Sequence, residues 1–208
     1  SLTGHSAEEL SKKFTEMQDD SEVTAGFMWQ KTTRESKKYQ LRGEILSFIP
    51  VDKNVEIMLV TITNTGRMAQ TVTPTAAIPL YGRSADNIRD HRHVTSLLHR
   101  IETTDTGVLV TPTLSFDERG HQVNHMTYYC VGWSGNGEKP VDFYPTAEDF
   151  VGEGGNFERP YAIVKNAEGV KAGTKIEGLE AVGGLHFSEI TLEPEEECSY
   201  LIFTGITE

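Results

Sequence analysis

The chain is a succession of short apolar, β-branched runs separated by turn sequences, and this pattern most constrains its fold. The clearest run, residues 55–63, is apolar on both faces from position 57 to 60, which is typical of a strand covered on both sides. Similar runs occupy residues 41–49, 71–80, 108–116, 125–131, 160–164, 185–192 and 199–204. Turn sequences such as Asn-Thr-Gly at 64–66 separate them. Many strands with few helices predict an all-β, mostly antiparallel sandwich or barrel.

One segment near the start departs from the strand pattern. Ser6 and Glu9 form a capping box, and four apolar residues recur at helical spacing: Ala7, Leu10, Phe14 and Met17. We therefore expect a single short N-terminal helix. A chain of 208 residues is long enough for one large core, so we expect one β-sandwich domain over residues 1–208.

Charge and cysteine content narrow the class of protein. The net charge of −12 argues against a nucleic-acid partner, because such proteins carry a basic footprint. Cys130 and Cys198 each lie in a strand-like run, so we expect two buried, inert thiols rather than a disulfide. No apolar run approaches the roughly 20 residues that span a bilayer, and no signal-peptide pattern opens the chain. A cytoplasmic protein without a membrane partner fits these features best.

The densest polar segment is residues 81–100, which hold four arginines, three histidines, two aspartates and an asparagine. Such a density of charged and planar groups usually holds something specific. The arginines match phosphate or carboxylate groups, but an internal arginine–aspartate lattice explains the segment as well, and both remain open. As candidate substrate-binding residues we take Arg83, Asp86, Asn87, Arg89, Asp90, His91, Arg92 and His93.

Within this segment, His91 and His93 form a pair that zinc could use if the backbone is extended there. A zinc site needs further ligands, and nothing else is placed by spacing. Arg89 and Arg92 flank the pair, and their charges oppose a dication. We therefore favour a hydrogen-bonded polar network and expect no metal.

A second unusual segment, residues 136–156, is long, aromatic and rich in glycine, which is typical of a functional or interfacial loop. Just before it, Trp133 is a candidate for stacking on a sugar ring, with packing in the core as the alternative. Several carboxylates are available for glycoside chemistry: Asp142, Glu148, Asp149, Glu153 and Glu158. Sequence gives no separation between them, so no catalytic residue is assigned.

Four stretches resemble a known family: residues 55–65, 78–93, 149–157 and 192–197. The most specific is the second, Ile-Pro-Leu-Tyr-Gly-Arg-Ser-Ala-Asp-Asn-Ile-Arg-Asp-His-Arg-His. It is similar to a stretch in phosphorylases of β-linked gluco-oligosaccharides. The chain resembles the N-terminal β-sandwich domain of glycoside hydrolase family 94, formerly glycosyltransferase family 36, which includes cellobiose, cellodextrin and β-1,2-oligoglucan phosphorylases.

The resemblance implies a galactose-mutarotase-like supersandwich that is a fragment of a larger, multidomain phosphorylase. In that family inorganic phosphate is the co-substrate, glucose 1-phosphate is the product, and no other cofactor is needed. The catalytic acid belongs to an (α/α)₆ barrel outside this sequence. The domain alone is then expected to be inactive, to pack against the barrel and in a homodimer, and to help form the acceptor side of the β-gluco-oligosaccharide site.

Other hypotheses remain. A stand-alone carbohydrate-binding module would use Trp133 or Tyr144 to bind β-glucans. A small metalloenzyme would be built on His91 and His93. A mutarotase-like epimerase would need a histidine–glutamate pair that the sequence does not identify.

Overall fold

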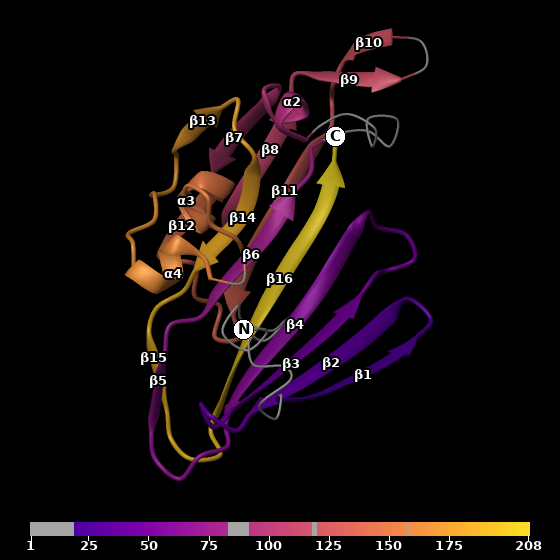
Figure 1. Ribbon diagram of the computed structural model, residues 1–208. Coiled ribbons are helices and arrows are strands. Elements are labelled where there is room, and N and C mark those ends of the chain that lie inside the picture. Colours follow the sequence, from indigo (N-terminus) through magenta and orange to yellow (C-terminus); the bar gives the residue numbers. More distant parts are fainter. Residues whose placement is uncertain (1–18, 83–91, 118–119, 158) are drawn as a thin grey trace.

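The computed structural model describes residues 19–82, 92–117, 120–157 and 159–208 (Figure 1). Sixteen strands are present among these residues: β1 (Asp20–Gly26), β2 (Trp29–Ser36), β3 (Leu41–Phe48), β4 (Val55–Asn64), β5 (Gln70–Val72), β6 (Thr75–Leu80), β7 (His99–Thr103), β8 (Gly107–Pro112), β9 (Leu114–Asp117), β10 (Gly120–Val123), β11 (Thr127–Ser134), β12 (Asp142–Thr146), β13 (Lys175–Glu177), β14 (Ala181–His186), β15 (Ile190–Leu192) and β16 (Glu197–Thr207). Three short helices accompany them: α2 (Arg92–Ser96), α3 (Ala147–Val151) and α4 (Tyr161–Lys165).

A nine-stranded sheet forms the body of the molecule, in the order β1-β2-β3-β4-β16-β11-β8-β7-β13. Every pairing in it is antiparallel. The last strand, β16, lies at the centre, between β4 and β11 (Figure 1). Because β16 is central, the C-terminal end of the chain joins the two halves of the sheet.

A three-stranded sheet, β12-β14-β6, packs on one face of the large sheet, here called the inner face. The core between the sheets includes Val108, Cys130 and Ile202 from the large sheet and Leu80 and Leu185 from the small one, all buried. Gly183 of β14 lies directly against Cys130, and a Cβ added there would overlap the cysteine side chain. Close approach of the two sheets therefore requires glycine at this position.

The two helices α3 and α4 form a third layer beyond the small sheet. Strand β12 supplies both layers, because Phe143 joins the core between the sheets whereas Tyr144 packs against Phe150 and Ala162 of the helices. The Tyr144 and Phe150 rings are 5.7 Å apart. Alternate residues of one strand thus hold the small sheet to the large sheet on one side and to the helices on the other.

The opposite face of the large sheet carries two rows of apolar side chains in register, which we call the outer apolar face. Leu46, Leu59, Leu201 and Trp133 are cross-strand neighbours along β3, β4, β16 and β11. The adjacent row is Trp29, Phe48, Ile57, Phe203 and Val131. Since side chains alternate along a strand, both rows face away from the core residue Ile202. Leu201 is 36% exposed at the middle of this face.

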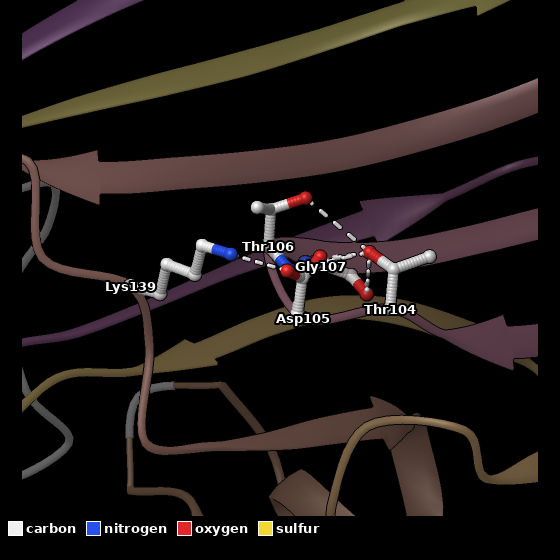
Figure 2. Close-up of polar contacts among 5 residues, drawn as sticks. All are labelled: Thr104, Asp105, Thr106, Gly107 and Lys139. Atoms are coloured by element: carbon white, nitrogen blue, oxygen red, sulfur yellow. Dashed lines mark hydrogen bonds and ion pairs between the residues drawn. The ribbon is translucent and has the colours of Figure 1, made fainter.

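Polar side chains organise the turns. Asn64 is fully buried; its amide donates to the carbonyls of Met68 and Leu192 at 2.8 and 2.9 Å, and its side-chain oxygen accepts from the Gly66 N–H. Figure 2 shows the β7–β8 turn, where the Thr104 hydroxyl accepts from the Gly107 N–H at 3.1 Å. In the same view, an ion pair joins Lys139 to Asp105.

The all-β, mostly antiparallel prediction is confirmed, and so are the strands expected at residues 41–49, 55–63 and 199–204. Both cysteines are free, as expected, but only Cys130 is buried, so the expectation of two buried thiols is wrong for the half-buried Cys198. The predicted run at 71–80 is split into β5 and β6 at Pro74. The predicted N-terminal helix lies outside the described residues. Within the described residues, no helix is long and apolar enough to cross a membrane.

The strand predicted at residues 160–164 is wrong, because this segment is the helix α4. Pro160 at its N-cap has φ −68°, which suits a helix start. Asn166 ends the helix in the left-handed conformation, with its N–H donating to the Ala162 and Ile163 carbonyls. One helical turn also lets Ala162 reach the aromatic cluster around Tyr144.

Candidate functional site

Most of the predicted substrate-binding residues belong to the segment 83–91. Arg83, Asp86, Asn87, Arg89, Asp90 and His91 lie outside the described residues. Arg92 and His93 open the helix α2, so the extended backbone assumed for a metal-binding histidine pair is wrong at His93. Among the described residues, no group of three or more histidine, cysteine or acidic side chains is arranged to hold a metal ion.

Trp133, the remaining predicted residue, lies in the outer apolar face. Its indole packs edge-on against Phe203, with ring centroids 5.7 Å apart at an interplanar angle of 80°. Its cross-strand partners are Leu201 and, through it, Leu59. Its surroundings on the sheet are therefore apolar rather than polar.

Two adjoining hollows lie against α3, and the first also reaches α4; we call them together the α3–α4 cleft. The first has a volume of about 340 Å³ and is bounded by Phe143 and Tyr144 of β12, by α3, by Tyr161 of α4 and by residues 167–170. The second has a volume of about 390 Å³ and extends to Phe157 on the other side of α3. Both hollows include Glu148, Gly152 and Glu153, so α3 and its C-terminal end form the ridge between them.

Hydrogen bonds join β12 to residues 167–170 along one wall of the first hollow. Phe143 and Val170 exchange backbone hydrogen bonds of 2.9 and 2.8 Å, which fix residues 167–170 against β12. The Tyr144 hydroxyl donates to the Ala167 carbonyl at 2.6 Å. Burial, together with the charge of Asp142, raises the pKa of Tyr144, so this hydroxyl keeps its proton at neutral pH.

The ends of α3 set the position of its acidic side chains. Thr146 is the N-cap, and its hydroxyl accepts from the Asp149 N–H at 3.0 Å and lies 2.6 Å from Asp149 Oδ2. Gly152 ends the helix with φ +77°. A Cβ at Gly152 would lie 2.7 Å from the Tyr161 Cβ, so glycine allows α4 to approach α3 at the edge of the cleft.

Asp142, one of the carboxylates considered for glycoside chemistry, is buried beside the cleft and hydrogen-bonded to His186. Its Oδ1 lies 2.7 Å from His186 Nδ1, and its Oδ2 lies 4.0 Å from Lys171 Nζ. Asp142 and His186 are also register partners between β12 and β14. This arrangement orders the strand pair, and among the described residues no hydroxyl or thiol is hydrogen-bonded to the pair as a nucleophile would be.

The other candidate carboxylates divide between the cleft and the undescribed part of the chain. Glu148, Asp149 and Glu153 line the cleft, whereas Glu158 lies outside the described residues. Sequence reasoning identified residues 136–156 as unusual but missed Tyr161 and Glu168, which lie beyond that segment. The signal for Tyr161 was its position directly after Pro160, which marks a helix start.

Comparison with known proteins gives the family. The family model for the glycosyl hydrolase 94 supersandwich domain matches residues 9–208, which is nearly the whole chain. None of the curated proteins matches the chain. The two packed antiparallel sheets agree with the architecture that the family's description names. The chain belongs to the glycosyl hydrolase 94 supersandwich domain family.

Proposed function

We propose that this chain is the non-catalytic N-terminal domain of an inverting β-glucoside phosphorylase. The complete enzyme would convert β-linked gluco-oligosaccharides and inorganic phosphate to glucose 1-phosphate in the cytoplasm, with no other cofactor. The domain would contribute a domain or subunit interface and the acceptor side of the sugar site. Its partners would be the catalytic barrel, a second copy of the chain and the oligosaccharide. Membership of the glycosyl hydrolase 94 supersandwich family supports this context.

The observation that carries the interface role is the outer apolar face. Nine apolar side chains lie there in two adjacent rows across β2, β3, β4, β16 and β11. Trp29, Phe48 and Leu201 are large and exposed within these rows. Contiguous apolar surface of this kind marks an interaction site on soluble proteins. A sheet face that spans five strands suits a broad partner surface better than it suits a small ligand.

The charged residues at the border of the outer apolar face also fit an interface role. Lys31 and Glu44 pair at 2.7 Å beside Leu46, so a polar pair borders the apolar rows at β2 and β3. An apolar centre with a polar rim is the usual anatomy of protein–protein interfaces. We therefore assign the outer apolar face to the homodimer.

Sedimentation velocity of the 208-residue chain tests this assignment. We expect a concentration-dependent dimer of the 23.1 kDa chain that Leu201→Glu converts to monomer, because the substitution would bury a carboxylate at the centre of the interface. Phe48→Glu, also on this face, is expected to weaken the dimer in the same direction. Circular dichroism would verify that both variants are folded.

Val23→Glu is the matched control, since Val23 is 66% exposed on the edge strand β1 and lies in register with residues of the opposite face. It is expected to leave the dimer unchanged. A dimer that survives both outer-face substitutions, or a chain that stays monomeric at all concentrations, would contradict the assignment.

The alternative function is a stand-alone carbohydrate-binding module. The observation that favours it is the α3–α4 cleft, which has aromatic and acidic side chains around it. Such a module would bind β-glucans without any catalytic partner.

A further inference from the structure

The α3–α4 cleft has a strongly one-sided charge. Five carboxylates line its two hollows: Glu148, Asp149, Glu153, Glu168 and Glu180. No lysine, arginine or histidine lines either hollow in the part of the chain that the structure describes. A phosphate group entering the cleft would meet like charge without a cation to pair with it. The cleft is therefore unsuited to phosphorylated sugars or inorganic phosphate.

The carboxylates are placed as separate hydrogen-bond acceptors rather than as a metal site. Asp149 is already bonded to the Thr146 hydroxyl. Glu148, Glu153 and Glu168 are exposed, and no three acidic groups of the described residues are arranged for a cation. Acceptors spread around a cleft match a ligand that carries many hydroxyl donors.

Each hollow also presents one exposed aromatic ring, whereas Phe143 and Tyr144 at the first hollow are buried. Tyr161 is 51% exposed at the first hollow, and Phe157 is exposed at the second, where its ring packs against Phe150 at 5.7 Å. An exposed ring beside carboxylate acceptors can stack on the apolar face of a sugar while the hydroxyl groups of the sugar donate hydrogen bonds to the carboxylates. Volumes of about 340 and 390 Å³ fall within the range of small-ligand sites.

We propose that the α3–α4 cleft binds an uncharged oligosaccharide through Tyr161, Phe157 and the shared Glu148 and Glu153, and that it rejects phosphorylated sugars. The choice of a β-gluco-oligosaccharide as the ligand rests on the proposed function. The cleft would retain the neutral substrate or acceptor chain and release the charged product, glucose 1-phosphate.

Amide NMR titration of the 208-residue chain tests the proposal with cellotetraose, a β-1,2-linked glucotetraose and glucose 1-phosphate as probes. We expect at least one tetraose to give saturable shifts at Gly152, Glu153 and Tyr161. Glucose 1-phosphate should produce none at the same concentration. Tyr161→Ala should weaken tetraose binding roughly tenfold, as expected for loss of a stacked ring. Tyr39→Ala is the matched control, because Tyr39 is 56% exposed on the distant β2–β3 turn.

A charge-neutralising variant separates the two parts of the proposal. Glu153→Gln keeps an acceptor oxygen but removes a charge, so it should retain tetraose binding and raise the affinity for glucose 1-phosphate. The proposal would be overturned if neither tetraose produced shifts, or if the shifts mapped to Trp133 and Leu201 instead. Equal shifts with glucose 1-phosphate would also overturn it. None of these outcomes alters the sedimentation test, so failure of the cleft is distinguishable from failure of the proposed function.

Discussion

The hydroxyl of Tyr144 donates a hydrogen bond of 2.6 Å to the carbonyl of Ala167, joining strand β12 to the segment that follows α4. Tyr144 is buried against Phe150 and Ala162 at the same point. The bond therefore connects the small sheet, the helical layer and the wall of the α3–α4 cleft.

Removing this hydroxyl should loosen the cleft. We expect Tyr144→Phe to reduce the free energy of unfolding by about 1 kcal/mol, because the ring packing survives while the Ala167 carbonyl loses its donor. Chemical denaturation measures the change. Tyr39→Phe, at an exposed turn, should have no measurable effect. Equal stabilities for the wild type and Tyr144→Phe would show that the bond contributes nothing.

The contact between the two sheets should tolerate no side chain at position 183. Gly183→Ala places a methyl group on the Cys130 side chain, and overpacking of this kind costs about 1–3 kcal/mol. The control is Gly137→Ala, where φ is +82° but nothing lies within 4 Å of the added carbon, so only backbone strain of about 1 kcal/mol is expected. Thermal unfolding of both variants makes the comparison, and a Gly183 variant as stable as wild type would contradict the packing described.

The two thiols should differ in reactivity from those of an unfolded chain. Burial raises the pKa of Cys130 to about 12, and burial also raises the pKa of the half-buried Cys198. Because the thiolate is the reactive form, we expect Cys130 to resist a thiol-specific disulfide reagent near neutral pH until the protein is unfolded. The Cys198→Ser variant isolates Cys130 for this assay. Rapid labelling of that variant in its native state would contradict the prediction.

His99 should make stability depend on pH. Burial lowers the pKa of the imidazole, which lies with Nδ1 3.0 Å from the Leu179 carbonyl oxygen. The unfolded chain then binds a proton at a higher pH than the folded chain does. Stability from this group is present above the unfolded pKa and is lost as pH falls toward the folded pKa.

We therefore expect the stability advantage of wild type over His99→Gln to shrink as the pH falls from about 8 to about 5, the range in which histidine titrates. Carboxylates with lowered pKa values, such as Glu44 and Asp105 beside their lysine partners, are common to both proteins and cancel in the difference. A difference that stays constant with pH would show that His99 does not contribute in this way.

Sequence reasoning could predict the strands wherever alternation of side chains reflects burial. Residues 55–63 and 199–204 pair in the structure as β4 and β16 at the centre of the large sheet, where both faces carry apolar side chains. The hairpin β1–β2 was missed because Asp20–Gly26 is an edge strand with mostly exposed residues, so no apolar pattern marks it. Helix α4 was mistaken for a strand because Ile163 and Val164 are β-branched and a five-residue run is too short to show its period.

The candidate site was predictable only in part. The composition of residues 136–156 predicted a long functional or interfacial loop, which is wrong for its second half, because the buried strand β12 and the helix α3 lie there. The acidic side chains of α3 do line the cleft. Glu168 lies at the cleft because Val170 pairs with Phe143 and Ala167 accepts a hydrogen bond from Tyr144, tertiary contacts that local sequence does not encode. The charged segment 83–91 lies outside the described residues, so its predicted role in sugar binding stays a prediction.

The most direct test of the proposed non-catalytic role is a phosphorolysis assay on the 208-residue chain alone. The chain would be incubated with inorganic phosphate and β-linked gluco-oligosaccharides of several linkages, and glucose 1-phosphate would be followed by a coupled enzyme assay. We predict no glucose 1-phosphate above the level of a protein-free control, because the catalytic acid is expected in a separate barrel. Turnover by the pure chain that is lost on substitution of a residue in the α3–α4 cleft would contradict the non-catalytic role and identify the cleft as an active site.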